Sequence, residues 1–231
     1  MFKKTTLTVL SIGLMAASAH AKGWNFQVEG GYSAMQGMPD DSQWNQLIND
    51  AGSSASEPTT AQSEGIDKIP LGLRFSVGYD FPVSDTVTLG PEVGFGYYGQ
   101  VKYNANFSSA TSAASGYDAY NLYGFDLLAN LTWHIIPQFS IFAKAGGQLG
   151  ILTRDTSIAF SNGWNGEGGD SNNGFIPMIG AGVAWNITNN FALQATYYHG
   201  FGQNTDFDQN SYAIENVPSF NAIMIGVKFG G

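Results

Sequence analysis

A few charged side chains interrupt segments that otherwise alternate between apolar residues and glycine or small polar residues. In the stretch LGPEVGFGYYG (89–99), Glu92 shares its face of the segment with glycines. Arg74, Asp126 and Lys144 hold corresponding positions in other alternating segments. A carboxylate removed from water is strongly destabilised unless it meets a cation. We therefore expect Arg74, Glu92, Asp126 and Lys144 to form a buried charge cluster.

The same face of these segments carries three further charged residues, Glu29, Asp80 and Lys228. Alternation assigns each residue to a face but leaves the register between segments undetermined. Individual ion pairs therefore cannot be assigned from the pattern. Two hypotheses remain for the cluster: it seals the interior of the protein, or it gates a narrow pore.

Other reactive chemistry is weakly represented. The chain has no cysteine, and Gly200 rather than serine follows His199, while His134 lies at a predicted strand end. The motif Asp206-x-Asp208-x-Asn210 resembles the start of a calcium loop, but serine replaces its glycine and Val217 takes the place of the closing glutamate. We expect no catalytic site, no metal and no cofactor. Nine basic against 18 acidic residues also argue against nucleic-acid binding.

The charged residues belong to segments with the period of a β-strand. Each segment is about 10 residues long, the length that a tilted strand needs to cross a bilayer. The eight segments are 24–32, 71–81, 87–97, 123–133, 139–151, 175–185, 191–201 and 223–229. A soluble β-sandwich would also alternate. The large apolar residues on one face and the length of the segments favour an all-β fold, an eight-stranded antiparallel up-and-down transmembrane β-barrel.

The predicted connections alternate between short and long. Short ones cover 82–85, 136–138 and 188–190, and long ones cover 34–69, 100–119, 152–174 and 202–217. This alternation is typical of outer-membrane barrels, which have short periplasmic turns and long extracellular loops. The long connections are acidic, and we expect them to be flexible surface loops. Their hydrophobic residues offer anchors for a partner; these are Trp44, Phe107, Trp164 and Phe207.

The N-terminus has the features of a secretory signal peptide. Met1–Lys4 is positively charged, an apolar run follows, and Ala19-His20-Ala21 is a small-x-small cleavage site. We expect residues 1–21 to be removed and residues 22–231 to form the barrel domain. Beyond Ala21 no apolar run reaches the roughly 18 residues of a spanning helix.

Aromatic residues cluster near the predicted strand ends, as expected of the girdles at a membrane interface. The predicted girdle comprises Trp24, Tyr32, Tyr79, Phe81, Trp133, Phe139, Trp185, Phe191 and Phe229.

The chain resembles the eight-stranded transmembrane barrel of OmpA-type outer-membrane proteins, without their peptidoglycan-binding domain. The resemblance is carried by LGPEVGFGYYG (89–99), IFAKAGGQLG (141–150), GAGVAWNITNNFALQATYYHG (180–200) and IMIGVKFGG (223–231). Such barrels resemble one another in a lumenal gate of two acids and two bases. Glu92 matches one acid, but the other positions fall on Asn130, Ala184 and Gln194, so the gate is not carried over. Phe229 resembles the C-terminal aromatic residue that outer-membrane assembly machinery recognises, although two glycines follow it.

These observations predict a monomeric integral protein of the Gram-negative outer membrane that is not an enzyme. Its expected partners are the lipid bilayer, lipopolysaccharide and the assembly machinery. Three roles fit: a structural role in envelope integrity, a surface adhesin that binds a host ligand through its loops, and a narrow gated pore.

Overall fold

The computed structural model describes residues 23–53, 60–109, 113–163, 165–203, 205, 214 and 216–230. The predicted signal peptide, Trp164, Phe207 and the Asp206–Asn210 motif lie outside these residues.

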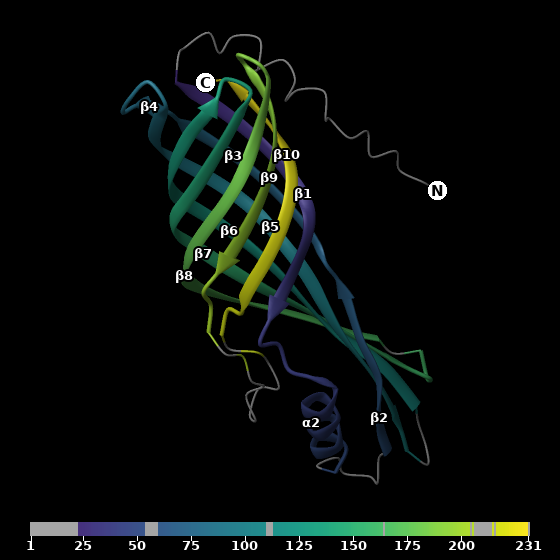
Figure 1. Ribbon diagram of the computed structural model, residues 1–231. Coiled ribbons are helices and arrows are strands. Elements are labelled where there is room, and N and C mark those ends of the chain that lie inside the picture. The colour runs from purple at the N-terminus through teal and green to yellow at the C-terminus, as the bar shows by residue number, and fades with distance from the viewer. Residues whose placement is uncertain are drawn as a thin grey trace.

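Eight strands form a closed antiparallel ring (Figure 1). Every ring strand pairs with two neighbours, and the ring closes where β1 pairs with β10, from Asn25 opposite Gly230 to Gln36 opposite Ser219. The predicted fold class is therefore confirmed. The ring strands are β1 (Trp24–Gln36), β3 (Leu71–Tyr79), β5 (Val87–Ser108), β6 (Ala113–Ile136), β7 (Phe139–Phe160), β8 (Asn165–Thr188), β9 (Phe191–Gly200) and β10 (Ser219–Gly230).

The start of the first ring strand, β1, and the end of the last, β10, lie at the same end of the barrel as the short connections (Figure 1). The two-residue strand β4 (Phe81–Pro82) pairs with the start of β5, and tight turns join β6 to β7 and β8 to β9. These turns lie where the sequence predicts short connections. We call this the terminal end.

At the opposite end, three of the four predicted loops contain regular secondary structure, and most of the fourth, 202–217, lies outside the described residues. Residues 100–108 continue β5, residues 113–119 belong to β6, and most of 152–174 lies in β7 and β8, so these strands are 22–24 residues long. The predicted connection 34–69 contains helix α2 (Asp41–Ser53) and strand β2 (Thr60–Ile69). Polar and glycine-rich segments pair as strands here because their neighbours satisfy the backbone hydrogen bonds.

These longer strands form a sheet that projects beyond the ring (Figure 1). Its order is β2–β5–β6–β7–β8, and α2 packs against β2. We call α2, β2 and the projecting parts of β5 to β8 the extension. The acidic residues of these segments are predicted to be solvated in loops, but at least one forms an ion pair within the extension: Asp118 lies 2.8 Å from Arg154.

A β-bulge in β5 marks the boundary between barrel and extension. Tyr97 pairs with Tyr123, but the next pair joins Gln100 to Asn121, so β5 contains one extra residue. Gly99 lies within this bulge with φ +105°, a conformation that glycine adopts readily. One extra residue reverses the facing of every later side chain. The inward residues of β5 are therefore even-numbered in the barrel and odd-numbered in the extension.

Helix α2 begins with a capping box. The Asp40 carboxylate accepts hydrogen bonds from the backbone N–H groups of Ser42 and Gln43, and the Gln43 side chain accepts one from the Asp40 N–H. No helix in the described part of the chain is long and apolar enough to cross a membrane.

The prediction that Trp44 is a surface anchor is wrong. Its side chain is buried, packs against Tyr103 with ring centroids 5.3 Å apart, and donates a hydrogen bond to the Asn104 carbonyl. Phe107 is partly buried against the same core. These side chains fix α2 to the projecting part of β5.

Candidate functional site

The interior of the barrel holds a network of ionic groups centred on Arg74. Its guanidinium lies 2.6 Å from the Asp126 carboxylate, 2.7 Å from that of Glu92 and 3.2 Å from that of Glu29. The contact with Asp126 is bidentate, since Nε also donates to Asp126 at 3.1 Å. Neither Arg74 nor its partners are exposed beyond 2%. A buried charge of this kind is tolerated because several hydrogen-bonded partners replace its water.

Lys144 joins the same network from β7. Its ammonium lies 2.9 Å from Glu92 Oε1, 2.9 Å from Gln27 Oε1 and 3.1 Å from the Tyr198 hydroxyl. Three acceptors use all three ammonium hydrogens. Glu92 therefore bridges the two cations, and the structure brings Arg74, Glu92, Asp126 and Lys144 into one cluster.

Two neutral residues that sequence reasoning left out link the charged groups of this network to one another. The Tyr198 hydroxyl donates to Glu29 at 2.7 Å and accepts from both Arg74 and Lys144. Gln27 links Lys144 to Glu92, and its amide donates to Glu92 at 2.9 Å. Both residues occupy the charged face of their strands, the one signal in the sequence that could have indicated them. We call these groups, with Glu29, Arg74, Glu92, Asp126 and Lys144, the lumenal network.

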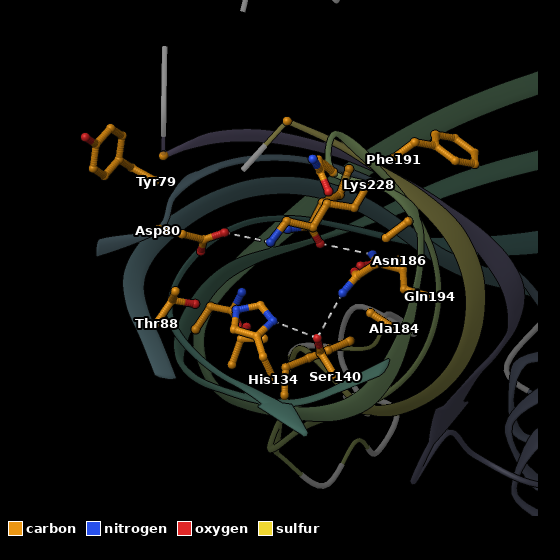
Figure 2. Close-up of a pocket in the computed structure, with 18 of the residues that line it drawn as sticks. Tyr79, Asp80, Thr88, His134, Ser140, Ala184, Asn186, Phe191, Gln194 and Lys228 are labelled. Carbon is orange, nitrogen blue, oxygen red and sulfur yellow. Dashed lines mark hydrogen bonds and ion pairs between the residues drawn. The ribbon is translucent and has the colours of Figure 1, made fainter. Parts of the chain in front are cut away.

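The remaining predicted inward charges form a separate pair. Lys228 lies 2.7 Å from Asp80, which also accepts a hydrogen bond from Asn25 at 3.0 Å. Figure 2 shows this pair at the opening of the barrel. It neutralises both groups without contacting Arg74 or Glu92.

The interior toward the extension is apolar, which corrects the prediction that the inner face carries only glycine, polar and charged residues. Tyr98 and Phe220 meet with ring centroids 4.1 Å apart, and both are fully buried. This apolar plug is continuous with the core of the extension. Its members within the barrel are Tyr98, Leu122, Leu152, Ile176, Met178, Phe220 and Met224.

At the terminal end, the network forms the floor of an open cavity of about 540 Å³, which we call the vestibule (Figure 2). The three gate positions that lack charge, Asn130, Ala184 and Gln194, all line it. Gln194 donates to Gln27 at 3.0 Å, so it supports the network as a neutral group. The structure places no ion pair at these three positions.

The vestibule wall also contains a histidine–serine contact that sequence reasoning missed. His134 Nδ1 lies 2.8 Å from Ser140 Oγ, and Asn186 donates to the same oxygen at 3.3 Å (Figure 2). A histidine beside a serine is the minimal arrangement for nucleophilic catalysis. Ser140 is 1% exposed, and its hydroxyl is engaged by both of these neighbours.

His199, the other histidine considered from sequence, lies at the end of β9 nearer the extension. Its Nδ1 is 2.6 Å from Asn221 Oδ1, which also accepts a hydrogen bond from Tyr197 at 2.7 Å. Among the described residues, no group of three or more histidine, aspartate or glutamate side chains could hold a metal ion. The Asp206–Asn210 motif is outside those residues, so it stays untested.

The predicted girdle residues lie near the terminal end of the barrel, except Tyr32, which lies nearer the extension. Trp24, Trp133 and Trp185 are about half exposed. Figure 2 shows Tyr79 and Phe191 pointing away from the interior. Phe229 packs against Phe191, with ring centroids 5.2 Å apart. Their roles at a membrane interface and in assembly stay predictions.

Comparison with known proteins gives one family match. The model of the OmpA-like transmembrane domain matches residues 41–229. No curated protein matches the chain.

Solved structures offer more distant similarities. The Yersinia pestis attachment invasion locus protein Ail is 15% identical, with 90% of this chain and 98% of that chain covered and a TM-score of 0.41. The N-terminal β-barrel domain of Pseudomonas aeruginosa OprF is 12% identical, with 90% and 97% covered and a TM-score of 0.35. The Escherichia coli outer-membrane protease OmpT is 6% identical, with 90% and 93% covered and a TM-score of 0.39. At these values, none of the three assigns an activity to this chain.

Proposed function

The chain belongs to the OmpA-like transmembrane domain family, and from this premise we propose that it is a closed outer-membrane barrel with a structural role in the envelope. One observation carries the proposal: the lumenal network and the apolar plug fill successive levels of the interior. Side chains at both levels are buried, so the interior offers no path for a solute. A barrel filled in this way can stabilise the membrane but is a poor channel.

The orientation follows from the two ends. If the short turns, the start of β1 and the end of β10 lie in the periplasm, the extension stands outside the cell. We propose a monomer in contact with bilayer lipid and lipopolysaccharide, inserted by assembly machinery that recognises Phe229. No enzymatic role is proposed, because the buried hydroxyl of Ser140 is held by its neighbours.

Single-channel recording in planar bilayers, combined with thermal unfolding, tests the closed barrel. Glu92→Gln leaves Arg74 and Lys144 with weaker partners, so the unfolding temperature should fall. Neither wild type nor variant should conduct, because the plug is intact in both. Conductance that appears in Glu92→Gln would favour the gated pore instead, and an unfolding temperature equal to wild type would contradict the role of the network.

The envelope role is tested in cells. Loss of the protein should increase leakage of a hydrophobic dye across the outer membrane. A variant in which tight turns replace 103–118 and 156–167 should restore the barrier, because the barrel is retained. Failure of the full-length chain to restore it would contradict the structural role.

A surface-interaction role is the second candidate, and one observation favours it. The buried core runs without interruption from the barrel into the extension, through Leu122, Tyr103 and Trp44 among others. A packed core would hold the outer surface in one shape, which lowers the entropic cost of binding a host ligand. The same truncated variant distinguishes the candidates, since it would lose binding to host cells and keep the permeability barrier.

A further inference from the structure

The outward face of the extension contains a polar hollow just beyond the bulge in β5. Its floor is Ala119 on β6, which is 4% exposed because longer side chains surround it. Across the sheet, Ala119 lies between Lys102 on β5 and Asp155 on β7. One step further from the barrel, Tyr117 on β6 and Glu167 on β8 complete the rim. A small residue among longer neighbours leaves space, and the hollow has a volume of about 440 Å³.

On one side of the hollow, Lys102 has no carboxylate partner among the described residues. Its ammonium lies 4.1 Å from the centroid of the Tyr117 ring. Asp67 lies opposite Lys102 on β2, but its carboxylate accepts a hydrogen bond from Asn104 at 2.9 Å and forms no ion pair with the lysine. The ammonium is therefore available to an anion that enters the hollow.

On the other side, two carboxylates also lack a cation. Asp155 accepts a hydrogen bond from Asn121 at 3.3 Å, and Glu167 is exposed on the neighbouring strand. None of the ion pairs in the described part of the chain includes Lys102, Asp155 or Glu167. Because β6 separates β5 from β7, the backbones of the lysine and the aspartate are about 10 Å apart. The hollow thus presents a cation and two acids on opposite sides, with space for a ligand between them.

This arrangement of charge limits the chemistry of a ligand. A simple anion would meet two carboxylates, a simple cation would meet the lysine, and a neutral group would leave both signs unpaired. A group that carries an anion and an ammonium a few atoms apart would pair with both sides at once. Phosphoethanolamine has this structure: its phosphate can accept hydrogens from Lys102, and its ammonium can donate to Asp155 and Glu167.

The level of the hollow indicates where such a group would come from. Tyr97 and Tyr123 pack together on the outer surface just before the bulge, with ring centroids 5.2 Å apart, as expected of aromatic residues at a membrane interface. Ala119 lies four residues from Tyr123 along β6, which in a tilted strand places the hollow about 10 Å beyond these rings. The headgroup layer of a phospholipid leaflet is only about 5–8 Å thick. The hollow therefore lies at the level of the sugars and phosphates of lipopolysaccharide.

We propose that this hollow binds a phosphoethanolamine group carried by lipopolysaccharide. The contact would hold the extension at the surface of the outer leaflet. The proposal rests on the proposed function, because it needs the extension to stand outside the cell. Binding of the isolated group can nevertheless be measured on purified protein whatever its orientation in the membrane.

Ligand-observed NMR on the full mature chain, in micelles of an uncharged detergent, tests the site with glycerophosphoethanolamine, ethanolamine and glycerol phosphate as probes. Exposed charge pairs are weak, so glycerophosphoethanolamine should bind with a Kd of about 10 mM. The other two probes carry one sign of charge each and should bind at least about threefold more weakly. Lys102→Met and Asp155→Asn should each weaken glycerophosphoethanolamine about threefold. Ala119→Phe, which fills the hollow, should abolish binding.

Two matched variants serve as controls. Lys68→Met and Asp85→Asn make the same changes at exposed residues outside the hollow, and both should bind like wild type. A shift between folded and heat-unfolded forms on a gel verifies folding of every variant. Equal affinity for the three probes, or wild-type binding by Ala119→Phe, would overturn the proposal. The barrier assay in cells does not depend on these results, so failure of the envelope role and failure of this site are distinguishable.

Native mass spectrometry distinguishes the two sources of the group. The protein is released from micelles that contain equal amounts of phosphatidylethanolamine and of lipopolysaccharide with and without phosphoethanolamine. Wild type should retain the modified lipopolysaccharide in preference to the others, and Lys102→Met should lose this preference. Preferential retention of phosphatidylethanolamine, or equal retention of the two lipopolysaccharides, would overturn the assignment to lipopolysaccharide.

Discussion

The barrel and the extension are built from the same strands but bury opposite kinds of side chain. In the barrel part of β6, Phe125 points outward and is 55% exposed, while Asp126 points inward and is 2% exposed. In the extension part of β5, by contrast, Tyr103 is fully buried while its polar neighbours Lys102 and Asn104 are partly exposed. Outside the apolar plug, the barrel is apolar on its outer face and charged within, whereas the extension buries apolar side chains and leaves polar ones partly exposed.

The surrounding medium explains this reversal. Lipid requires apolar residues on the outside and leaves polar residues for the interior, whereas water drives apolar residues into a core. The strands achieve the reversal in two ways. In β5 the apolar residues stay odd-numbered and the bulge at Gly99 turns them inward. In β6 the strand has no bulge at this level. Instead, the apolar residues change from the outer face, up to Tyr123, to the inner face, from Leu122 onward.

The largest effect should come from breaking the charged interior of the barrel. Arg74→Met leaves Glu29, Glu92 and Asp126 buried without their shared cation, and removing one partner of a buried ion pair costs about 3–5 kcal/mol. Urea unfolding in micelles measures it. Lys102→Met, in the extension, is the control; it removes only the contact of the ammonium with the Tyr117 ring, 4.1 Å away, and should cost at most about 1 kcal/mol. Similar losses in the two variants would refute the distinction.

A lysine placed on the outer surface should report the change of medium directly. Ala145 and Ala159 are both exposed on the outward face of β7, one in the barrel and one in the extension. Ala145→Lys should destabilise by about 2–4 kcal/mol because it puts a charge in lipid. Ala159→Lys should stay within about 0.5 kcal/mol because it faces water. Equal costs, measured by unfolding in lipid vesicles, would mean that the boundary lies elsewhere.

The bulge that reverses β5 should be sensitive to a single methyl group. At Gly99, φ is +105° and the Ile69 carbonyl oxygen lies 3.1 Å from where a Cβ would stand. Gly99→Ala should cost about 1–3 kcal/mol through backbone strain. Hydrogen exchange should show the loss in the extension more than in the barrel. Uniform loss across both regions would show that they unfold as one unit.

The smallest effect should come from the helix cap, at the edge of the extension. Hydrogen bonds from the Ser42 side chain and the Gln43 backbone lower the pKa of the Asp40 carboxyl. A carboxylate with a lowered pKa stabilises the folded helix above its ordinary value of 3.8, and this stability is lost as the pH falls through the lowered value. Proteolysis within α2 should therefore accelerate on acidification. In Asp40→Ala, proteolysis within α2 should be faster than in wild type at neutral pH, and its rate should not rise on acidification.

Prediction from sequence succeeded for properties that depend on the residue pattern of a single strand. Period-two alternation was enough to predict the ring and to assign Arg74, Glu92, Asp126 and Lys144 to the inner face. It failed in the extension, because polar residues in 100–119 and 152–174 indicate a loop and a water-exposed strand equally well. It also missed Tyr198 and Gln27, since a neutral residue on the inner face gives no signal until its partners are known.

The sequence alone therefore determined the fold class, the number of ring strands and the face on which each charge lies, because these depend on local periodicity. Only the tertiary structure decided which charges meet, because register depends on strands that are distant in the chain. Glu92 shows both: its face could be read from LGPEVGFGYYG, while its place between Arg74 and Lys144 required three strands to be set side by side.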